Sequence, residues 1–277
     1  MKNGLLKVIE AKKDQDIVII GKGPSIDKVR TDLLDDFIVI NVNDSEIICP
    51  GEIAIFHSGW VLDRFDHHRP KAKLYITDRE FNYGPEVLKA KFVPNDPETA
   101  DFLLDRFFEE ELYIEQSIFA SALKVANHIS SYLGQRKRVY LLGFDFSVKE
   151  GFSKKITDAR HGLEDAYIEQ IINVQEKVFE SILAQRSKLS IDVFHVGSKP
   201  YSFYSTDAFN GIVEGKADAQ TAVTATNAAA HSGEVQIVAE ITTNHFGDWH
   251  RLEAMIRAAK AAGADFIKLQ KRDVNTF

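Results

Sequence analysis

A glycine-rich turn directly after a short apolar run has the composition of a ligand-binding loop. The run is Asp16–Ile20 (DIVII), and the turn is Gly21-Lys22-Gly23-Pro24-Ser25. Glycines allow backbone N–H groups to come close to a ligand, often a phosphate or a nucleotide. Pro24 fixes φ and can begin a helical turn, which the Ser25 hydroxyl can cap. Because ligands bind beyond the carboxyl ends of strands in open α/β sheets, we expect a binding loop here. The alternative is a tight strand-to-helix connection that binds nothing.

His161 is a candidate for acid–base chemistry. It lies in the segment ITDARHGLEDAY. An imidazole with an unperturbed pKa near ~6.5 can act as a general base that removes the proton of an attacking hydroxyl group. Asp158, Arg160 and Asp165 are near enough in sequence to orient the ring or to hold a carboxylated ligand. We take His161 as the candidate general base, and the alternative is an ordinary solvated entry to a helix.

The other histidines and the acidic run do not predict a metal site. His67 and His68 are adjacent, so on a helix they point in different directions, and no cysteine or third histidine stands at metal-ligand spacing. His57 follows an apolar strand and is expected to pack or to line a ligand pocket. The run Glu109–Glu111 is expected to be a solvated helix face. We therefore expect no metal and no cofactor.

Strand-like and helix-like segments alternate along the chain, which predicts a parallel sheet covered on both faces. The expected strands are short apolar runs, at Asp16–Ile20, Phe37–Val42, Ile53–Phe56, Leu74–Thr77, Val139–Phe144 and Ile191–Val196. The expected helices run from Asp96-Pro97-Glu98 to Glu111, from Ser117 to the C-cap Gly134, and from about Leu163 to Gln185. The predicted fold class for residues 1–206 is therefore α/β, with a Rossmann-like parallel sheet and helices on both faces.

Composition is that of a soluble globular protein with a substantial core. Hydrophobic residues make up 44% and charged residues 27% of the 277 residues. The net charge is −7 and no long basic run occurs, which argues against nucleic acid as a partner. No apolar run is long enough to span a bilayer or to form a signal peptide. Cys49 is the only cysteine, so an intrachain disulfide is excluded and a cytoplasmic location is expected.

The end of the chain differs in character from its beginning. Residues 207–233 are rich in Ala, Thr and Gly and have few large apolar side chains, which predicts a linker. Residues 234–277 predict a strand, a loop, a helix and a second strand. The helix signals are an N-cap, an apolar stripe and a C-cap glycine, at Asp248, Leu252, Met255, Ile256, Ala259 and Gly263. One such unit is the beginning of a (β/α)8 barrel, so we predict a truncated β-α-β piece of a TIM barrel.

The first domain resembles the small bacterial sialyltransferases, which use CMP-sialic acid as donor. The resemblance rests on GKGPS, on the following LLDDFIVINVND and on VYLLGFDFS, within roughly Ile17–Ser198. In that family an asparagine at the end of the second strand contacts the cytidine, and Asn43 stands at that place. The catalytic histidine lies in the interval that contains His161. The resemblance implies a nucleotide-binding set of Gly21, Gly23, Pro24, Ser25, Asn43, Ser117, Gly143 and Asp145.

The chain also departs from the sialyltransferase pattern. The family uses two tyrosines to hold the leaving phosphate, but this chain has Ser147 at the first position and Phe152-Ser153 near the second. Ile118 replaces the glycine of the family's Thr-Ser-Gly motif. The Gly-x-Gly-Pro-Ser turn also occurs in proteins that resemble archaeal 6-hydroxymethylpterin pyrophosphokinase, some of them linked to flagellin glycosylation. The turn by itself therefore does not fix the nucleotide.

The C-terminal segment resembles the N-terminus of the sialic acid (N-acetylneuraminate) synthases, which condense phosphoenolpyruvate with an N-acetylhexosamine. The resemblance rests on AEI, Thr243-Asn244-His245, Gly247-Asp248 and GADFIKLQ. It implies that residues at the mouth of that barrel correspond to Glu240, Asn244, His245, Lys268 and Gln270. We expect these to be remnants, because the family takes its divalent metal and most substrate ligands from later strands.

The combined expectation is an enzyme, a sialyltransferase-like glycosyltransferase. It would move a nonulosonic sugar from CMP to an acceptor hydroxyl with inversion, so its partners would be a CMP-linked donor and a glycan acceptor. One alternative is the N-terminal part of a bifunctional nonulosonate synthase. Another is a module that binds a nucleotide sugar without turnover. A single β-α-β unit leaves apolar faces that need cover from the first domain or another chain, which is compatible with a homo-oligomer.

Overall fold

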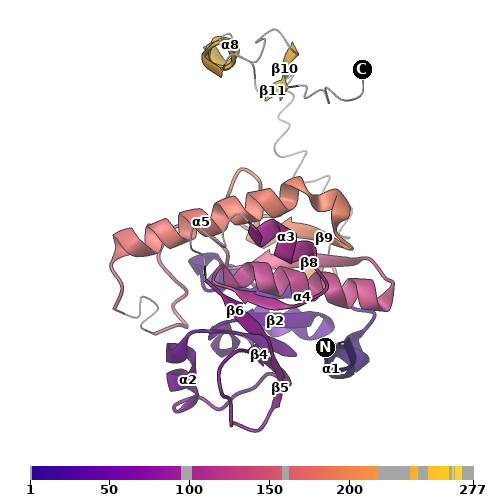
Figure 1. Cartoon of the computed structure of the whole chain (residues 1–277). Helices are drawn as coiled ribbons and strands as arrows, with labels where there is room; N and C mark the ends of the chain where they lie inside the picture. Colours follow the sequence, from indigo (N-terminus) through magenta and orange to yellow (C-terminus); the bar gives the residue numbers. More distant parts are fainter. Residues whose placement is uncertain are drawn as a thin grey trace. The chain divides into compact units, whose positions relative to one another are not determined.

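The computed structural model describes residues 2–94, 102–157, 162–216, 238–242, 249–261, 264 and 266–269. The chain divides into two compact units, Met1–Thr226 and Asn227–Phe277, and each is described by itself (Figure 1). Within the part of the chain that is described, no helix is both long enough and apolar enough to cross a membrane.

The first unit is built on a seven-stranded parallel sheet, in the order β5-β4-β3-β2-β1-β8-β9. Its strands are β1 (Ile17–Ile20), β2 (Ile38–Val42), β3 (Ile53–Ile55), β4 (Leu74–Thr77), β5 (Glu86–Lys89), β8 (Lys137–Leu142) and β9 (Ile191–His195). The central strands are buried on both faces, which explains why β1 and β2 read as nearly continuous runs of Ile and Val. The predicted α/β class with a parallel, Rossmann-like sheet is confirmed.

The chain order places a topological switch point beside β1. From β1 the chain moves outward through β2, β3, β4 and β5, and it later returns to β8 on the other side of β1. Connections therefore leave the carboxyl ends of β1 and β8 in opposite directions. In open α/β sheets this geometry opens a crevice at the carboxyl edge, where ligands bind.

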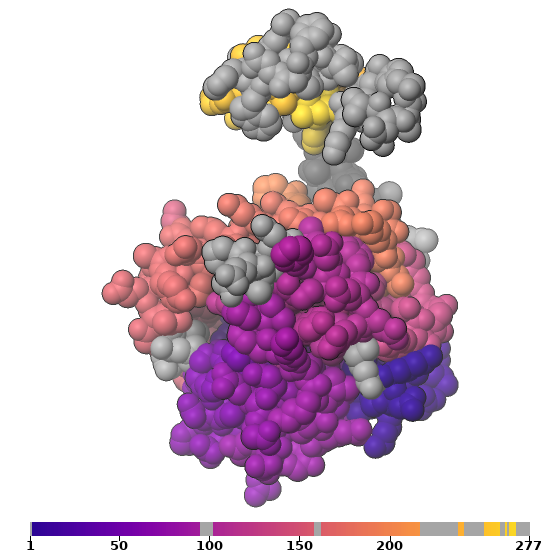
Figure 2. All heavy atoms as spheres, viewed as in Figure 1, coloured from indigo at the N-terminus to yellow at the C-terminus, as the bar shows by residue number. Residues whose placement is uncertain are grey.

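Helices cover both faces of the sheet. One face packs against α1 (Lys2–Ile9), α3 (Leu103–Phe108), α4 (Ile118–Leu133) and α5 (Asp165–Ala184). Figure 2 shows the indigo residues of α1 at the surface beside the magenta residues of the α4 region, which α1 contacts. The other face packs against the short helices η2 (Pro24–Lys28) and η3 (Thr31–Asp36), α2 (Gly59–Phe65) and α6 (Thr206–Val213). The predicted C-cap of α4 is confirmed, since Gly134 has φ 61°.

The helix α6 corrects the predicted linker. Composition predicted a linker from residue 207, but α6 spans Thr206–Val213 and buries Phe209 completely. Phe209 packs its ring against Tyr140 of β8 at a centroid distance of 5.1 Å. The Ser205 hydroxyl caps the helix by accepting a hydrogen bond from Ala208 N at 3.1 Å. The first domain therefore extends through α6, and residues 217–233 lie outside the described residues.

Other elements also differ from the prediction. The helix expected from Asp96 is described only as α3, which ends at Phe108, so Glu109–Glu111 lie beyond a helix end rather than on a helix face. Three strands were not predicted. They are the edge strand β5 and the separate parallel pair formed by β6 (Lys91–Val93) and β7 (Tyr113–Glu115).

The second unit has the predicted strand-helix-strand order. Its elements are β10 (Val238–Thr242), α8 (Trp249–Ala261) and β11 (Phe266–Leu269), and the two strands pair in parallel. Among the α8 side chains that the structure describes, Leu252 is buried, and Met255, Ile256 and Ala259 are half-buried, as their helical spacing predicts. The expected caps Asp248 and Gly263 lie outside the described residues. That the unit begins a TIM barrel stays a prediction.

A buried histidine on α4 makes the first domain sensitive to acid. Burial and the positive charge of Lys124 lower the pKa of His128 to about 4. Its Nε2 has no hydrogen-bond partner among the described residues, and its ring stacks on Tyr132. The unfolded chain takes up this proton below the ordinary pKa of about 6.5, but the folded chain does not until about pH 4. The unfolding free energy therefore falls as the pH drops through this window.

Replacing His128 by phenylalanine, which keeps an aromatic ring beside Tyr132, is expected to remove this acid sensitivity. Between pH 7 and pH 5 the variant should gain about 2 kcal/mol relative to the wild type, at about 1.4 kcal/mol per pKa unit. Urea unfolding at both pH values measures the difference. The exposed His68→Gln is the matched control. Equal pH dependence of His128→Phe and wild type would contradict this explanation.

Candidate functional site

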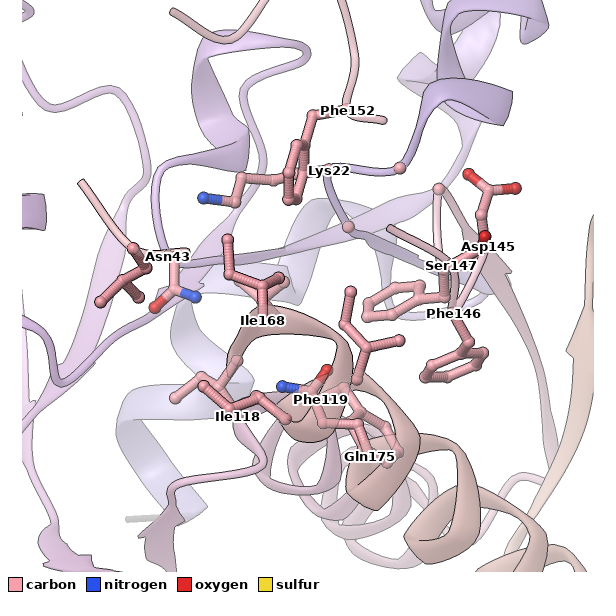
Figure 3. Close-up of a pocket in the computed structure, with 18 of the residues that line it drawn as sticks. Lys22, Asn43, Ile118, Phe119, Asp145, Phe146, Ser147, Phe152, Ile168 and Gln175 are labelled. Atoms are coloured by element: carbon pink, nitrogen blue, oxygen red, sulfur yellow. The ribbon is translucent and has the colours of Figure 1, made fainter. Parts of the chain in front are cut away.

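A cavity of about 310 Å³ lies at the carboxyl ends of β1 and β8 (Figure 3). It is therefore located at the switch point of the sheet. Its walls come from the glycine turn, the end of β2, the segment from β3 into α2, the start of α4, the loop after β8, and α5 with the segment just before it. The residues that line it are Gly21, Lys22, Gly23, Val42, Asn43, Ser58, Trp60, Gln116, Ile118, Phe119, Gly143, Phe144, Asp145, Phe146, Ser147, Gly151, Phe152, Leu163, Ile168, Ile171, Ile172 and Gln175.

The glycines of the turn are required because two strand-end loops meet there. Gly21 N donates to Leu142 O at 2.8 Å, and Gly23 N donates to Gly143 O at 2.7 Å. A Cβ atom on Gly21 would lie 2.5 Å from Gly143 O, and one on Gly23 would lie 2.1 Å from Asp145 Oδ2. Gly143 itself has φ 71°. The glycines thus allow close contact between backbones, and at least two of their N–H groups are bonded to protein carbonyls rather than directed at a ligand.

Asp145 fixes the second half of the turn. Its Oδ2 accepts a hydrogen bond from Ser25 N at 3.0 Å, and the residue is buried. In Figure 3 its carboxylate lies on the opposite side of the cavity from the Lys22 ammonium. Pro24 and Ser25 are not among the lining residues, although both were predicted to bind the nucleotide. The Ser25 hydroxyl is buried and has no hydrogen-bond partner among the described residues.

The loop after β8 has an unusual backbone that two side chains, one from the end of β9 and one just beyond it, hold in place. Phe146 has φ 45°, a left-handed conformation that costs a non-glycine residue on the order of 1 kcal/mol or more. Lys199 Nζ donates to Phe146 O at 3.1 Å, and His195 Nε2 lies 2.7 Å from Phe144 O. Burial lowers the pKa of His195, which favours the neutral ring. Because a carbonyl only accepts, Nε2 carries the proton and Nδ1 accepts from Ser202 Oγ at 2.9 Å.

Asn43 lies where the resemblance places it, at the end of β2 and in the cavity wall. It has φ 53°, which asparagine tolerates better than most residues. Its N–H donates to Ile55 O at 2.8 Å, so the backbone is fixed by the neighbouring strand. In Figure 3 the Asn43 amide and the Lys22 ammonium lie toward the same side of the cavity.

The start of α4 forms the floor of the cavity as Figure 3 is drawn. Gln116, Ile118 and Phe119 line it, but Ser117 does not. Ser117 is buried at the N-cap position, and its side chain makes no capping hydrogen bond. The structure therefore brings the N-terminus of a 16-residue helix to the cavity without bringing the predicted Ser117 hydroxyl into the wall.

The remaining walls are mainly apolar. Leu163, Ile168, Ile171 and Ile172 project from the α5 region, and Phe152 comes from the loop after β8. Ser147, at the position of the family's first tyrosine, and Phe152, near the second, both line the cavity. The site thus has no phenolic hydroxyl at either described position.

Lys22 and its partners are the main feature that the sequence reasoning missed. Lys22 Nζ lies 3.1 Å from Asp44 Oδ1 and 4.4 Å from the centroid of the Trp60 ring. Arg64 Nε lies 3.7 Å from Asp44 Oδ2. Burial lowers the pKa of Lys22, and Asp44 partly offsets that effect. Lys22 stands inside the recognised turn, but sequence alone gives no signal that Asp44 and Trp60 surround it.

Other predicted residues lie outside the cavity wall or outside the described residues. Four of them lie outside the described residues, namely His161, Asn244, His245 and Gln270. His57 packs instead of lining the cavity, since its ring stacks on Phe92 and its Nδ1 lies 2.9 Å from Asp78 Oδ1.

In the second unit, Glu240 and Lys268 stand opposite each other on the paired strands β10 and β11. Their charged groups are 3.3 Å apart. Over all described residues, no group of three or more His, Cys, Asp and Glu side chains is arranged to hold a metal ion.

No model of a known protein family, no curated protein and no solved structure matches this chain. What the cavity binds must therefore be inferred from its own residues.

Proposed function

We propose that the first domain binds a CMP-linked nonulosonic sugar and transfers that sugar to an acceptor hydroxyl with inversion. The observation that carries the proposal is the position of the cavity. It lies at the carboxyl edge of a parallel sheet, beside the switch point, and is bordered by Gly21, Gly23, Asn43, Gly143 and Asp145. These five belong to the set that the sialyltransferase resemblance implies.

The surroundings of the cavity suit a nucleotide with an anionic group. Apolar and aromatic walls can enclose a base or a sugar, and a few polar groups then set its orientation. The N-terminus of α4 carries a partial positive charge that favours an anion. Oriented N–H groups and side-chain donors can stabilise a departing phosphate, so the proposed transfer requires no metal.

The proposed base is His161. The residues on either side of it in the sequence support that role. Leu163, two residues later, lines the cavity, and Thr157, four residues earlier, is held by Arg64 through a 3.1 Å hydrogen bond to its Oγ1. In the proposed step, the acceptor hydroxyl loses its proton to His161 as its oxygen attacks the sugar carbon, and CMP leaves with the electron pair of the broken bond.

A module that binds the nucleotide sugar without transferring it is the second candidate. The observation that favours it is the cavity wall at Ser147 and Phe152, where no phenolic hydroxyl is present for the leaving phosphate. Hydrolysis of the CMP-sugar donor distinguishes the two functions. A transferase of this kind slowly transfers the sugar to water and releases CMP, whereas a binding module releases the donor intact.

Thermal unfolding of the full chain with nucleotides tests the donor assignment. At CMP concentrations about 100-fold above Kd, binding should add about 2.7 kcal/mol and raise the Tm of the first domain by roughly 5–10 °C. ATP, GMP and UMP at the same concentration serve as matched ligands and should give smaller shifts. A shift with ATP but not with CMP would contradict the assignment.

A further inference from the structure

The cavity wall contains few charged side chains, and they are not equally able to contact a ligand. Among the described lining residues, Lys22 is the one cation and Asp145 the one anion. Asp145 is bonded to the backbone of Ser25, and a Cβ on Gly23 would collide with its carboxylate, so that group is packed against the turn. The Lys22 side chain is 14% exposed and is directed to the side of the cavity where Asn43 lies (Figure 3).

Lys22 pairs with the buried carboxylate of Asp44, whose negative charge is balanced by only one further cation among the described residues. Asp44 is 1% exposed, and neither of its oxygens accepts a well-directed hydrogen bond among the described residues. Its charge is balanced by ion pairs at 3.1 Å with Lys22 and at 3.7 Å with Arg64. A buried carboxylate without a partner is strongly destabilising, so Asp44 requires at least one of the two cations.

Arg64 can keep that role if Lys22 moves. It is fixed on its far side by Thr157, whose Oγ1 accepts from Nη1 at 3.1 Å and whose carbonyl accepts from Nη2. The backbone of Lys22 is fixed as well, because its carbonyl accepts from Ser153 N at 2.8 Å and the flanking glycines are bonded to the β8 end. Only the flexible Lys22 side chain is therefore left to exchange one anion for another.

We propose that Lys22 is the anion-binding residue of the cavity, and that Asp44 is its counter-ion when no ligand anion is present. The ligand group is a phosphate ester, such as that of a nucleotide, and it competes with Asp44 for the ammonium. Asp44 then keeps Arg64 as its partner. The ammonium is poorly solvated, which strengthens its attraction to an incoming anion. The inference rests on the proposed function for the choice of CMP as the first probe.

Calorimetric titration of the full chain with CMP and with cytidine tests the inference. Lys22→Gln is expected to weaken CMP binding about 10- to 100-fold, as for loss of one charge-assisted hydrogen bond, and to leave cytidine binding unchanged. Lys22→Arg should restore much of the CMP affinity. Asp44→Asn should strengthen CMP binding several-fold, because the competing carboxylate is gone. A purely structural role for Lys22 would not separate CMP from cytidine in this way.

A salt series on the wild type covers the case in which a variant fails to fold. The CMP dissociation constant should rise with salt, whereas that of cytidine should not. Equal CMP affinity of folded Lys22→Gln and wild type, or a salt-independent CMP affinity, would overturn the inference.

Repeating the titrations with UMP, AMP and ATP separates this inference from the proposed function. If another nucleotide binds in place of CMP and still depends on Lys22, the donor assignment is wrong but the anion site stands. If CMP binds and does not depend on Lys22, the donor assignment stands and the anion site is wrong. If none of these nucleotides binds, both are wrong.

Discussion

Replacement of Gly23 by alanine is expected to destabilise the first domain by roughly 2–4 kcal/mol and to weaken ligand binding in the cavity. The new Cβ would lie 2.1 Å from Asp145 Oδ2 and 2.9 Å from Gly143 O. Asp145 cannot move away without losing its hydrogen bond from Ser25 N. The clash would therefore disturb both the turn and the loop after β8, which form adjoining walls of the cavity.

Urea unfolding of the variant and the wild type measures the loss. Gly4→Ala in α1 is the matched control, since its Cβ would make an ordinary contact at 3.8 Å with Glu86 Oε1. That control should be neutral or stabilising by up to about 1 kcal/mol, because alanine favours the helix. A second test combines Gly23→Ala with Asp145→Ala. If the carboxylate causes the clash, the double variant should be more stable than the sum of the single effects. Equal stability of Gly23→Ala and wild type would contradict the geometry.

Replacement of His161 by alanine is the second prediction with a large effect. Transfer from a CMP-sugar should fall about 10²- to 10⁴-fold, the usual contribution of a general base, while CMP affinity should stay as in the wild type. CMP contacts are proposed for the turn and for Asn43, so removal of the base leaves them in place. Transfer rates with a saturating donor, together with CMP titrations, measure the two effects separately.

The matched control for this variant is His68→Ala, which removes an exposed imidazole outside the cavity wall. It should leave both transfer and CMP affinity unchanged. Transfer by His161→Ala at the wild-type rate would remove His161 from the mechanism. A loss of CMP affinity would instead assign it to donor binding.

Much of the sheet could be predicted because its central strands are short apolar runs that can be identified in the sequence. Strands buried on both faces read as nearly continuous apolar runs rich in Val, Ile and Leu, and the runs that form β1 and β2 have this composition. The edge strand β5 (EVLK) was missed because it has only two apolar residues and is half exposed. The helix α6 was missed because only one of its side chains, Phe209, is buried, and the segment that follows it has a linker-like composition.

The position of the cavity could be predicted from the sequence, but the ion pair beside it could not. The glycine turn and Asn43 follow strands that end at one edge of the sheet, so their proximity could be expected from topology. The ion pair of Lys22 with Asp44 joins two strand ends through side-chain positions that no spacing rule specifies. The glycines were expected to bring N–H groups to a ligand. Those of Gly21 and Gly23 are instead bonded to the end of β8.

A crystal structure of the full chain with CMP or a non-transferable CMP-sugar analogue tests the central proposal most directly. We predict that the nucleotide occupies the cavity between the glycine turn and the start of α4, with its cytosine beside Asn43 and its phosphate on Lys22. In that complex Lys22 should have left Asp44, and Asp44 should be paired with Arg64 alone. A cavity that stays empty at saturating CMP, or a nucleotide bound elsewhere on the chain, would contradict the proposal.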